Sequence, residues 1–160
     1  MKRFLYIILL VVLSFSGCTS DSSNPTEPDD PSPYTTRMAV VTYVYDGDTI
    51  QVDGSERVRY IGIDTPEREE CYYSEATQRN RELVSNKTVL LEICKASPVD
   101  QYDRTLAHIT VNGSLVNAIL IQEGYARAYR VPPCTSRADY YATLEREARD
   151  AGRGMWTACY

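Results

Sequence analysis

Three β-forming segments follow one another between Met38 and Ile63 with almost no chain between them. Residues 38–45 are rich in β-branched and aromatic side chains, and residues 49–52 and 57–63 alternate between apolar and polar. Asp-Gly pairs separate the segments, and this dipeptide is typical of tight hairpin turns. Because such short connections can join only antiparallel neighbours, this part of the chain is predicted to form an antiparallel meander.

The rest of the chain adds strands and helices. Apolar and β-branched residues predict two more strands, over residues 87–93 and 106–111. Helical spacing of apolar residues predicts three helices, over residues 74–84 with Ser74 as the cap, over 114–123 before Gly124, and over 137–151 before Gly152. Five short strands with inserted helices predict an α+β domain, namely a five-stranded OB-fold β-barrel with three α-helices.

Residues 1–18 have the features of a targeting segment. Lys2 and Arg3 precede an apolar run that is too short to span a bilayer. The ending Phe15-Ser16-Gly17-Cys18 resembles a bacterial lipobox, whose cysteine becomes lipidated, although an aliphatic residue is usual where Phe15 stands. An ordinary secretory signal is the alternative. We therefore expect an exported protein, which is either a periplasmic or cell-surface lipoprotein anchored to the membrane through Cys18 or a secreted protein.

Residues 19–33 are rich in Ser, Pro, Asp and Glu and contain no leucine, valine or aromatic residue. Such a segment cannot bury a core, so it is predicted to be a flexible acidic tether. Residues 34–160 are long enough to enclose a single core and are predicted to form one domain. We expect this domain to be a monomer.

Four cysteines follow Cys18, and an exported chain carries them into an oxidising compartment. Two disulfides are the natural interpretation, and the alternatives are free buried thiols or a zinc site. Zinc is disfavoured, because there is no Cys-x-x-Cys pair and the chain has a single histidine. Three pairings are possible and the sequence does not choose among them. The candidates are Cys71, Cys94, Cys134 and Cys159.

Two acidic clusters lie close together in the sequence, one ending at Asp48 and the other running from Asp64 to Glu67. Carboxylate and carbonyl oxygens are the ligands that a hard cation such as Ca²⁺ prefers. Arg59 and Arg104 carry planar guanidinium groups, which match the oxygens of a phosphate. The combination indicates a metal-dependent phosphodiesterase.

The chain has a formal net charge of −5. Proteins that bind nucleic acid through charge alone usually present a basic face, which an acidic domain does not supply. Any chemistry on nucleic acid must therefore be local, with a cation and a few arginines offsetting the acids.

Three motifs together resemble the staphylococcal nuclease, or thermonuclease, family. They are Tyr45-Asp46-Gly47-Asp48-Thr49, Arg59-x-x-Gly62-Ile63-Asp64-Thr65-Pro66-Glu67, and Asp100-Gln101-Tyr102-Asp103-Arg104-x-Leu106-Ala107. The similarity runs from about Val40 to Trp156, and the order and spacing of the motifs make it specific. The resemblance implies an OB-fold nuclease that uses Ca²⁺ to hydrolyse DNA and RNA, breaking the bond between phosphorus and the 5′ oxygen.

The resemblance also implies a metal site. Asp48 and Asp64 would bind Ca²⁺ through their carboxylates and Thr65 through its backbone carbonyl, and water and phosphate would complete the shell. A divalent ion in this place can offset the charge that a phosphate gains during cleavage, and it can lower the pKa of a bound water.

For the substrate, the resemblance implies that Arg59 and Arg104 contact the scissile phosphate and that Glu67 positions or deprotonates the attacking water. Tyr102 would help to seat a nucleotide phosphate. Tyr129 is the candidate for stacking on a base, although its surroundings do not align cleanly with the family. Arginine suits the phosphate contacts because it stays protonated at working pH.

One departure from the family concerns Asp103, since a glycine is common before the loop arginine. Its charge is expected to weaken the hold of Arg104 on phosphate. The alternative functions are a catalytically silent OB module that binds oligonucleotide or protein, and a structural lipoprotein. Degenerate copies of the domain typically lose the acids or the arginines, whereas this chain keeps both sets.

Overall fold

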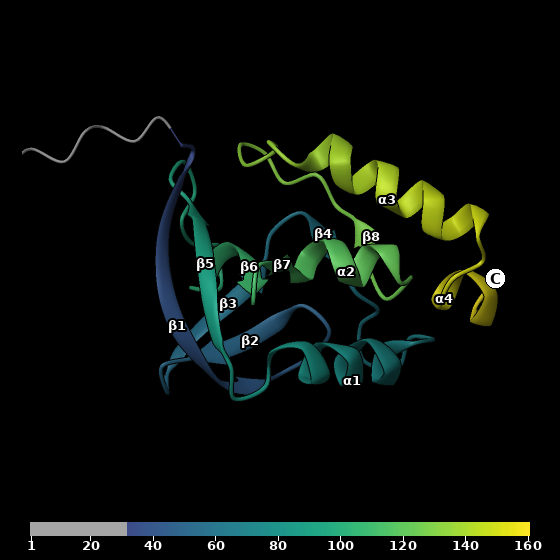
Figure 1. The fold of residues 1–160 in the computed structure, drawn as a ribbon, viewed down its shortest axis with the longest axis horizontal. Helices are drawn as coiled ribbons and strands as arrows, with labels where there is room; N and C mark the ends of the chain where they lie inside the picture. Colours follow the sequence, from purple (N-terminus) through teal and green to yellow (C-terminus); the bar gives the residue numbers. More distant parts are fainter. Residues whose placement is uncertain (1–31) are drawn as a thin grey trace, which may run out of the picture. The chain divides into compact units, whose positions relative to one another are not determined.

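The computed structural model describes residues 32–160 (Figure 1). The predictions for the signal segment, for Cys18 and for residues 19–31 of the tether lie outside these residues. One six-stranded sheet has the order β3-β2-β1-β5-β6-β7, and a second sheet pairs β4 with β8. The strands are β1 (Tyr34–Val44), β2 (Thr49–Val52), β3 (Glu56–Tyr60), β4 (Ile63–Asp64), β5 (Thr88–Cys94), β6 (Thr105–Val111), β7 (Ser114–Leu115) and β8 (Arg127–Ala128).

The first sheet closes on itself. Antiparallel pairing joins β1 to β2 and β2 to β3, which confirms the predicted meander. Strand β5 pairs antiparallel with β1 and with β6. A parallel pairing of β3 with β6 then completes the barrel, with Arg59 opposite Leu106. The predicted α+β fold with a five-stranded OB-type barrel is confirmed.

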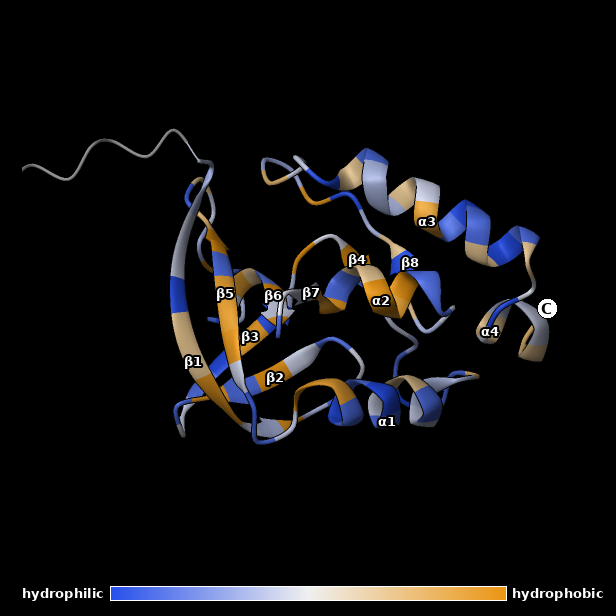
Figure 2. Ribbon diagram, viewed as in Figure 1, coloured by the Kyte–Doolittle hydropathy of each residue, from blue (hydrophilic) through white to orange (hydrophobic). Residues whose placement is uncertain are grey.

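The interior of the barrel is filled by alternating side chains of its strands. Ile50, Val58, Leu91 and Ile109 are all fully buried in one apolar cluster. Strand β6 differs from the others, because four successive residues, 106–109, are buried. Helix α2 packs against β6, so that both faces of this strand are covered. Figure 2 shows the hydrophobic character of α2 beside the more hydrophilic α1.

The helices are α1 (Tyr73–Val84), α2 (Val116–Gln122), α3 (Ala138–Asp150) and the short α4 (Met155–Ala158), which was not predicted. Helix α2 contacts both α1 and α3, which lie on either side of it in Figure 1. Within residues 32–160, no helix has the length and hydrophobicity needed to cross a membrane.

Two predicted helix boundaries are wrong. Residues 114–115 do not begin α2, because the turn at residues 112–113 returns the chain to β6 as the short strand β7. Ser74 does not cap α1, which begins one residue earlier, after Tyr72 in the left-handed region (φ 75°) and without a side-chain cap.

A buried polar cluster joins α3 to the barrel. The His108 ring of β6 lies between two tyrosine hydroxyls, with Nε2 3.1 Å from Tyr34 and Nδ1 2.8 Å from Tyr141. Burial lowers the pKa of His108 to about 3, and the Arg137 charge acts in the same direction. A Cβ at Gly62 would lie 2.6 Å from the Tyr141 ring, so glycine permits this approach of α3. His108 therefore has a structural role, in which it links α3 to the barrel.

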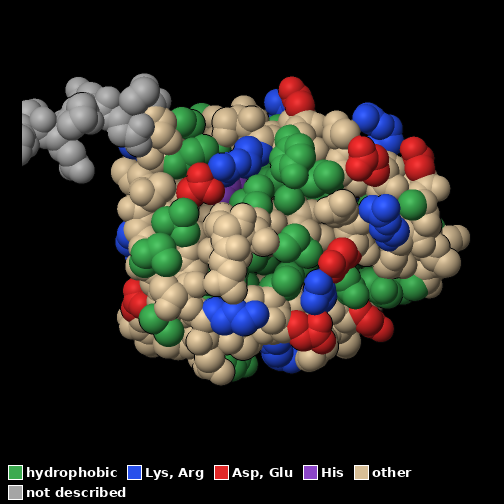
Figure 3. All heavy atoms as spheres, in the orientation of Figure 1, with side chains coloured by type: hydrophobic (Ala, Val, Ile, Leu, Met, Phe, Trp, Pro, Cys, Tyr) green, Lys and Arg blue, Asp and Glu red, His purple; other side chains and the backbone are tan. Residues whose placement is uncertain are grey.

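The charges on the surface are mixed. On the face drawn in Figure 3, Lys and Arg side chains are interspersed with Asp and Glu. Ion pairs of this kind include Arg79 with Glu123 and Arg130 with Asp139. This face therefore carries no continuous basic stripe, in keeping with the acidic net charge.

Candidate active site

Asp48 lies in the turn between β1 and β2 and is only 5% exposed. Its Oδ2 accepts hydrogen bonds from the backbone N–H and from the hydroxyl of Thr65, both at 2.9 Å. A Cβ at Gly47 would lie 2.7 Å from Cβ and Oγ1 of Thr65, so the turn can approach Thr65 only with a glycine there. The two acidic clusters predicted from the sequence are thus joined through Thr65.

Arg59, on β3, bridges the two predicted metal-binding carboxylates. Its Nη1 forms an ion pair with Asp48 Oδ2, and its Nη2 donates to Asp64 Oδ1 at 2.9 Å. The Arg59 side chain is 14% exposed, whereas that of Asp64, at the end of β4, is 42% exposed. One largely buried guanidinium therefore pairs with two acids, one in the turn before β2 and one on β4.

The charges in this cluster are not balanced. Burial raises the pKa of Asp48 above its usual value, while Arg59 lowers it and Asp46 raises it further. Burial also raises the pKa of Asp64, again against the effect of Arg59. Both carboxylates would therefore gain from additional positive charge.

A divalent cation suits this arrangement. The two carboxylates offer hard oxygen ligands, which Ca²⁺ prefers, and their raised pKa values show that Arg59 alone does not compensate them. Within residues 32–160, no group of three or more His, Cys, Asp or Glu side chains could hold a metal ion. The donor set here is smaller, with two carboxylates, so a cation would need carbonyl, water or substrate oxygens as well.

Arg104 is held by a carboxylate that the sequence analysis did not single out. Asp100 Oδ2 accepts from Arg104 Nε at 2.8 Å, and its Oδ1 accepts from the backbone N–H groups of Tyr102 and Arg104. Although burial acts to raise the pKa of Asp100, these hydrogen bonds lower it overall. The Arg104 guanidinium lies 5.3 Å from the centre of the Tyr102 ring.

Asp103, the departure from the family pattern, is exposed and has a φ of 59°. This left-handed conformation explains why a glycine suits the position, and aspartate is among the residues that tolerate it. Asp103 forms no ion pair within residues 32–160. The carboxylate that holds Arg104 is that of Asp100.

A groove of about 610 Å³ brings five of the predicted site residues together. They are Arg59, Asp64, Tyr102, Arg104 and Tyr129. Apolar residues such as Ile61, Leu106 and Val131 line it as well. Asp48 and Thr65 are not among the lining residues, although Asp48 forms an ion pair with Arg59, which is. Glu67 is exposed and also outside the lining, and its backbone N–H donates to Glu70 Oε2 at 2.9 Å.

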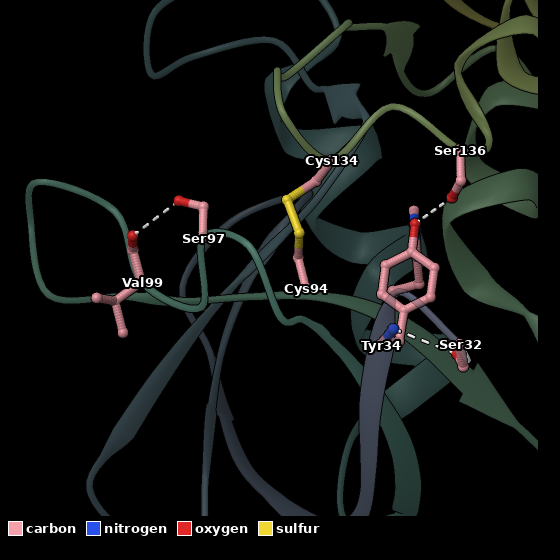
Figure 4. Close-up of a disulfide and its surroundings, with 8 residues drawn as sticks. Ser32, Tyr34, Cys94, Ser97, Val99, Cys134 and Ser136 are labelled. Carbon is pink, nitrogen blue, oxygen red and sulfur yellow. Dashed lines mark hydrogen bonds between the residues drawn. A yellow bond between two sulfur atoms is a disulfide. The ribbon is translucent and has the colours of Figure 1, made fainter. Parts of the chain in front are cut away.

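One of the two disulfides lies beside this groove. Cys94, at the end of β5, pairs with Cys134, which follows Tyr129 and Val131 on the way to α3 (Figure 4). Cys71 pairs with Cys159, which joins the segment before α1 to the end of α4. The first bridge lies in a small apolar cluster with Ile61 and Leu106, so the groove wall that carries Tyr129 is anchored to the barrel.

Two supporting residues were assigned no role from the sequence. Asp100 lies four residues before Arg104, a spacing that could have suggested an ion pair. Asn80, on α1, is fully buried, donates to the Asp46 carbonyl at 2.9 Å and accepts from the Tyr60 hydroxyl at 2.9 Å. A polar residue among the apolar positions of a helix was the available signal for Asn80.

Comparison with known proteins gives consistent results. The chain is 39% identical over 122 residues to the SPbeta prophage-derived endonuclease YokF of Bacillus subtilis, covering 70% of this chain but only 41% of that relative. It is 34% identical to the endonuclease YncB of the same organism, covering 86% of this chain and 72% of the relative. It is also 34% identical to the thermonuclease of Staphylococcus intermedius, covering 73% of this chain and 74% of that relative.

The family assignment rests on a match over most of the domain. Residues 57–158 match the family model described as staphylococcal nuclease homologue. The matched range contains Arg59, Asp64 and Arg104, and Asp48 lies just before it. The closed barrel and the order of the motifs agree with this match. The chain therefore belongs to the staphylococcal nuclease family.

Proposed function

We propose that this protein is an exported, Ca²⁺-dependent nuclease that hydrolyses DNA and RNA at the bond between phosphorus and the 5′ oxygen. The observation that carries the proposal is the groove, whose lining includes Arg59, Asp64 and Arg104. The names of the relatives, two endonucleases and a thermonuclease, support the same activity.

The substrate phosphate would bind between the two arginines. Each guanidinium can donate two parallel hydrogen bonds to phosphate oxygens. Arg59 comes from a barrel strand and Arg104 from the loop before β6, and carboxylates hold both side chains in place. Catalysis then depends on positive charge that is positioned before the phosphate gains charge.

Asp48, Asp64 and the carbonyl of Thr65 would hold the cation. When bound, Ca²⁺ would supply positive charge beside the phosphate and lower the pKa of a bound water. Glu67 would orient the attacking water or accept its proton, and its exposure leaves its carboxylate accessible to solvent. Attack at phosphorus would release the 5′ oxygen as a hydroxyl group and leave the phosphate on the 3′ side.

The flanking side chains would bind the nucleotides on either side of the reacting phosphate. Tyr102 is 61% exposed and Tyr129 is 57% exposed, and both line the groove. An exposed aromatic face in a groove suits stacking on a base.

Export is part of the proposal. The targeting segment and the lipobox-like ending at Cys18 support a lipid anchor in a membrane, with the acidic tether as a spacer. The two disulfides within the domain fit an oxidising compartment. Mass spectrometry of the membrane fraction tests the anchor, since lipidation adds acyl chains to a peptide that begins at Cys18.

Cleavage assays test the activity. The purified chain should cut single-stranded and duplex DNA with Ca²⁺ and fail to do so with chelator. Arg104→Gln should lower the rate by about 10² to 10³. Arg81→Gln, which removes the same charge from an exposed position of α1, should leave the rate unchanged. A folded, Ca²⁺-binding chain without any cleavage would instead favour the silent OB module.

A further inference from the structure

We propose that a second pocket, at the C-terminal end of the domain, binds a nucleotide of single-stranded substrate outside the groove. This C-terminal pocket is lined by Arg127, Glu145, Arg149, Trp156 and Tyr160 and has a volume of about 440 Å³. The proposal rests on the proposed function, because the strand that reaches this pocket is the strand cut in the groove.

Two aromatic rings form one wall of the pocket. Trp156, on α4, and Tyr160 stack with their ring centres 5.4 Å apart and their planes at 26°. Tyr160 is 75% exposed, so its ring remains largely accessible. Exposed aromatic faces are the usual platforms for bases of single strands, because every base has a face that can stack.

Two arginines supply the charge. The Arg149 guanidinium lies 4.8 Å from the centre of the Trp156 ring, and that of Arg127 lies 6.0 Å from the centre of the Tyr160 ring. Neither arginine forms an ion pair with any residue between 32 and 160. Glu145 is the single acidic side chain among the five lining residues, so the lining side chains together carry a net positive charge. An arginine beside an aromatic ring can bind a phosphate while the base stacks.

The pocket is connected to the groove through one short pair of strands. Arg127, on β8, is the direct partner of Asp64, on β4, in their antiparallel pairing. Asp64 lines the groove and Arg127 lines the C-terminal pocket. Partner residues in such a pair have Cα atoms about 5 Å apart. A strand whose phosphate lies at Asp64 and Arg59 can therefore continue towards Arg127.

This geometry favours single strands over duplex. Stacking on the exposed Tyr160 ring requires an unpaired base, whereas the phosphate contacts of Arg127 and Arg149 do not depend on sequence. The expected ligand is thus an oligonucleotide long enough to occupy both sites, with little preference among bases.

Intrinsic fluorescence tests binding directly, because Trp156 is the single tryptophan of the chain. With chelator present to prevent cleavage, a twelve-residue oligothymidylate should quench Trp156, and a thymidine dinucleotide at the same phosphate concentration should not. Absence of quenching by the longer strand, or equal quenching by both, overturns the proposal.

Variants of the C-terminal pocket then distinguish binding of the oligonucleotide from a purely structural role of these side chains in holding α4 in place. Arg149→Gln and Tyr160→Ala should each raise KM for the twelve-residue strand by about fivefold, and leave KM for the dinucleotide unchanged. Arg149→Gln should also reduce the salt dependence of binding by about one counterion. Arg146→Gln, an exposed charge change on the same helix outside the pocket, should change neither value.

The outcomes are distinguishable. Loss of thermal stability with no length-dependent change in KM would show that the cluster only braces the C-terminus, which overturns the proposal. If a folded chain fails to cleave the dinucleotide and the long strand alike, the nuclease function fails, while quenching by the longer strand still supports the pocket.

Discussion

Asp48 and Asp100 are both largely buried, and each holds an arginine of the groove, yet their pKa values shift in opposite directions. Asp48 shares Arg59 with Asp64 and has Asp46 nearby, and burial raises its pKa. For Asp100, burial also acts to raise the pKa, but hydrogen bonds from the Arg104 side chain and from two backbone N–H groups outweigh it. Additional positive charge, such as a bound cation, would therefore stabilise the ionised form of Asp48. The ionised form of Asp100 is already stabilised by the groups that it binds.

Removing the charge of Asp48 should have the largest effect. We expect Asp48→Asn to lower Ca²⁺-dependent cleavage by on the order of 10³ or more, because a ligand of the proposed cation becomes neutral. With chelator, the free energy of unfolding should not fall, since a buried and poorly compensated charge is removed. Cleavage assays and thermal unfolding measure the two quantities. A rate within tenfold of the unmodified protein would contradict the metal site.

The same substitution at Asp100 should behave differently. Asp100→Asn should lower the cleavage rate by about 10- to 100-fold, because Arg104 loses its orientation, and should lower the free energy of unfolding by about 1–3 kcal/mol. The metal affinity should be unchanged.

The contribution of Asp100 to the free energy of unfolding depends on pH with a definite sign. Because the folded-state pKa of Asp100 is lowered, its contribution to stability is complete above the unfolded pKa of about 4 and is lost as pH falls through the folded value. Urea unfolding of the unmodified protein and of Asp100→Asn should therefore converge once the pH falls below the folded-state pKa of Asp100. Curves that stay parallel down to that pH would assign the loss to packing instead of charge.

His108 differs from both acids, because its ring partners are the neutral hydroxyls of Tyr34 and Tyr141. Its folded-state pKa of about 3 lies below the unfolded value of about 6.5, so stability is complete above pH 6.5 and falls as pH drops. The slope should reach about 1.4 kcal/mol per pH unit. His108→Gln should flatten this slope. In NMR, the single imidazole of the chain should not titrate between pH 5 and 8.

Asp103 should give the smallest effect. Because it is exposed and forms no ion pair within residues 32–160, Asp103→Gly should change the cleavage rate by less than about threefold. Asp103→Asn is the matched control, since it removes the charge but keeps a residue that tolerates the left-handed conformation. A larger gain in both variants would mean that the Asp103 charge restrains Arg104 despite its exposure.

Local patterns predicted much of the fold. The alternation of residues 49–52 and the turn dipeptides gave the meander, because hairpins are specified by neighbouring residues. The parallel pairing of β3 with β6 joins residues more than forty positions apart, as in Val58 with Thr105, and no local pattern encodes it. The disulfide pairing was left open for the same reason, since four cysteines allow three pairings.

The sequence predicted some residues of the candidate site but not the contacts that hold them in place. Motifs identified Arg59, Asp64 and Arg104, and the structure brings them to one groove. The hold of Asp100 on Arg104 depends on a loop whose backbone N–H groups converge on one carboxylate. Residue types alone do not specify the conformation of such a loop, so the contacts of Asp100 could be identified only in the folded chain.

The parallel seam between β3 and β6 has a consequence for when activity can arise. Arg59 lies within this seam and Arg104 directly precedes it, so the pairing of β3 with β6 brings both residues to the same groove. A domain without this pairing would lack the groove that both arginines line, so we expect cleavage to require the closed barrel. During refolding, cleavage activity is therefore expected to appear together with closure of the barrel.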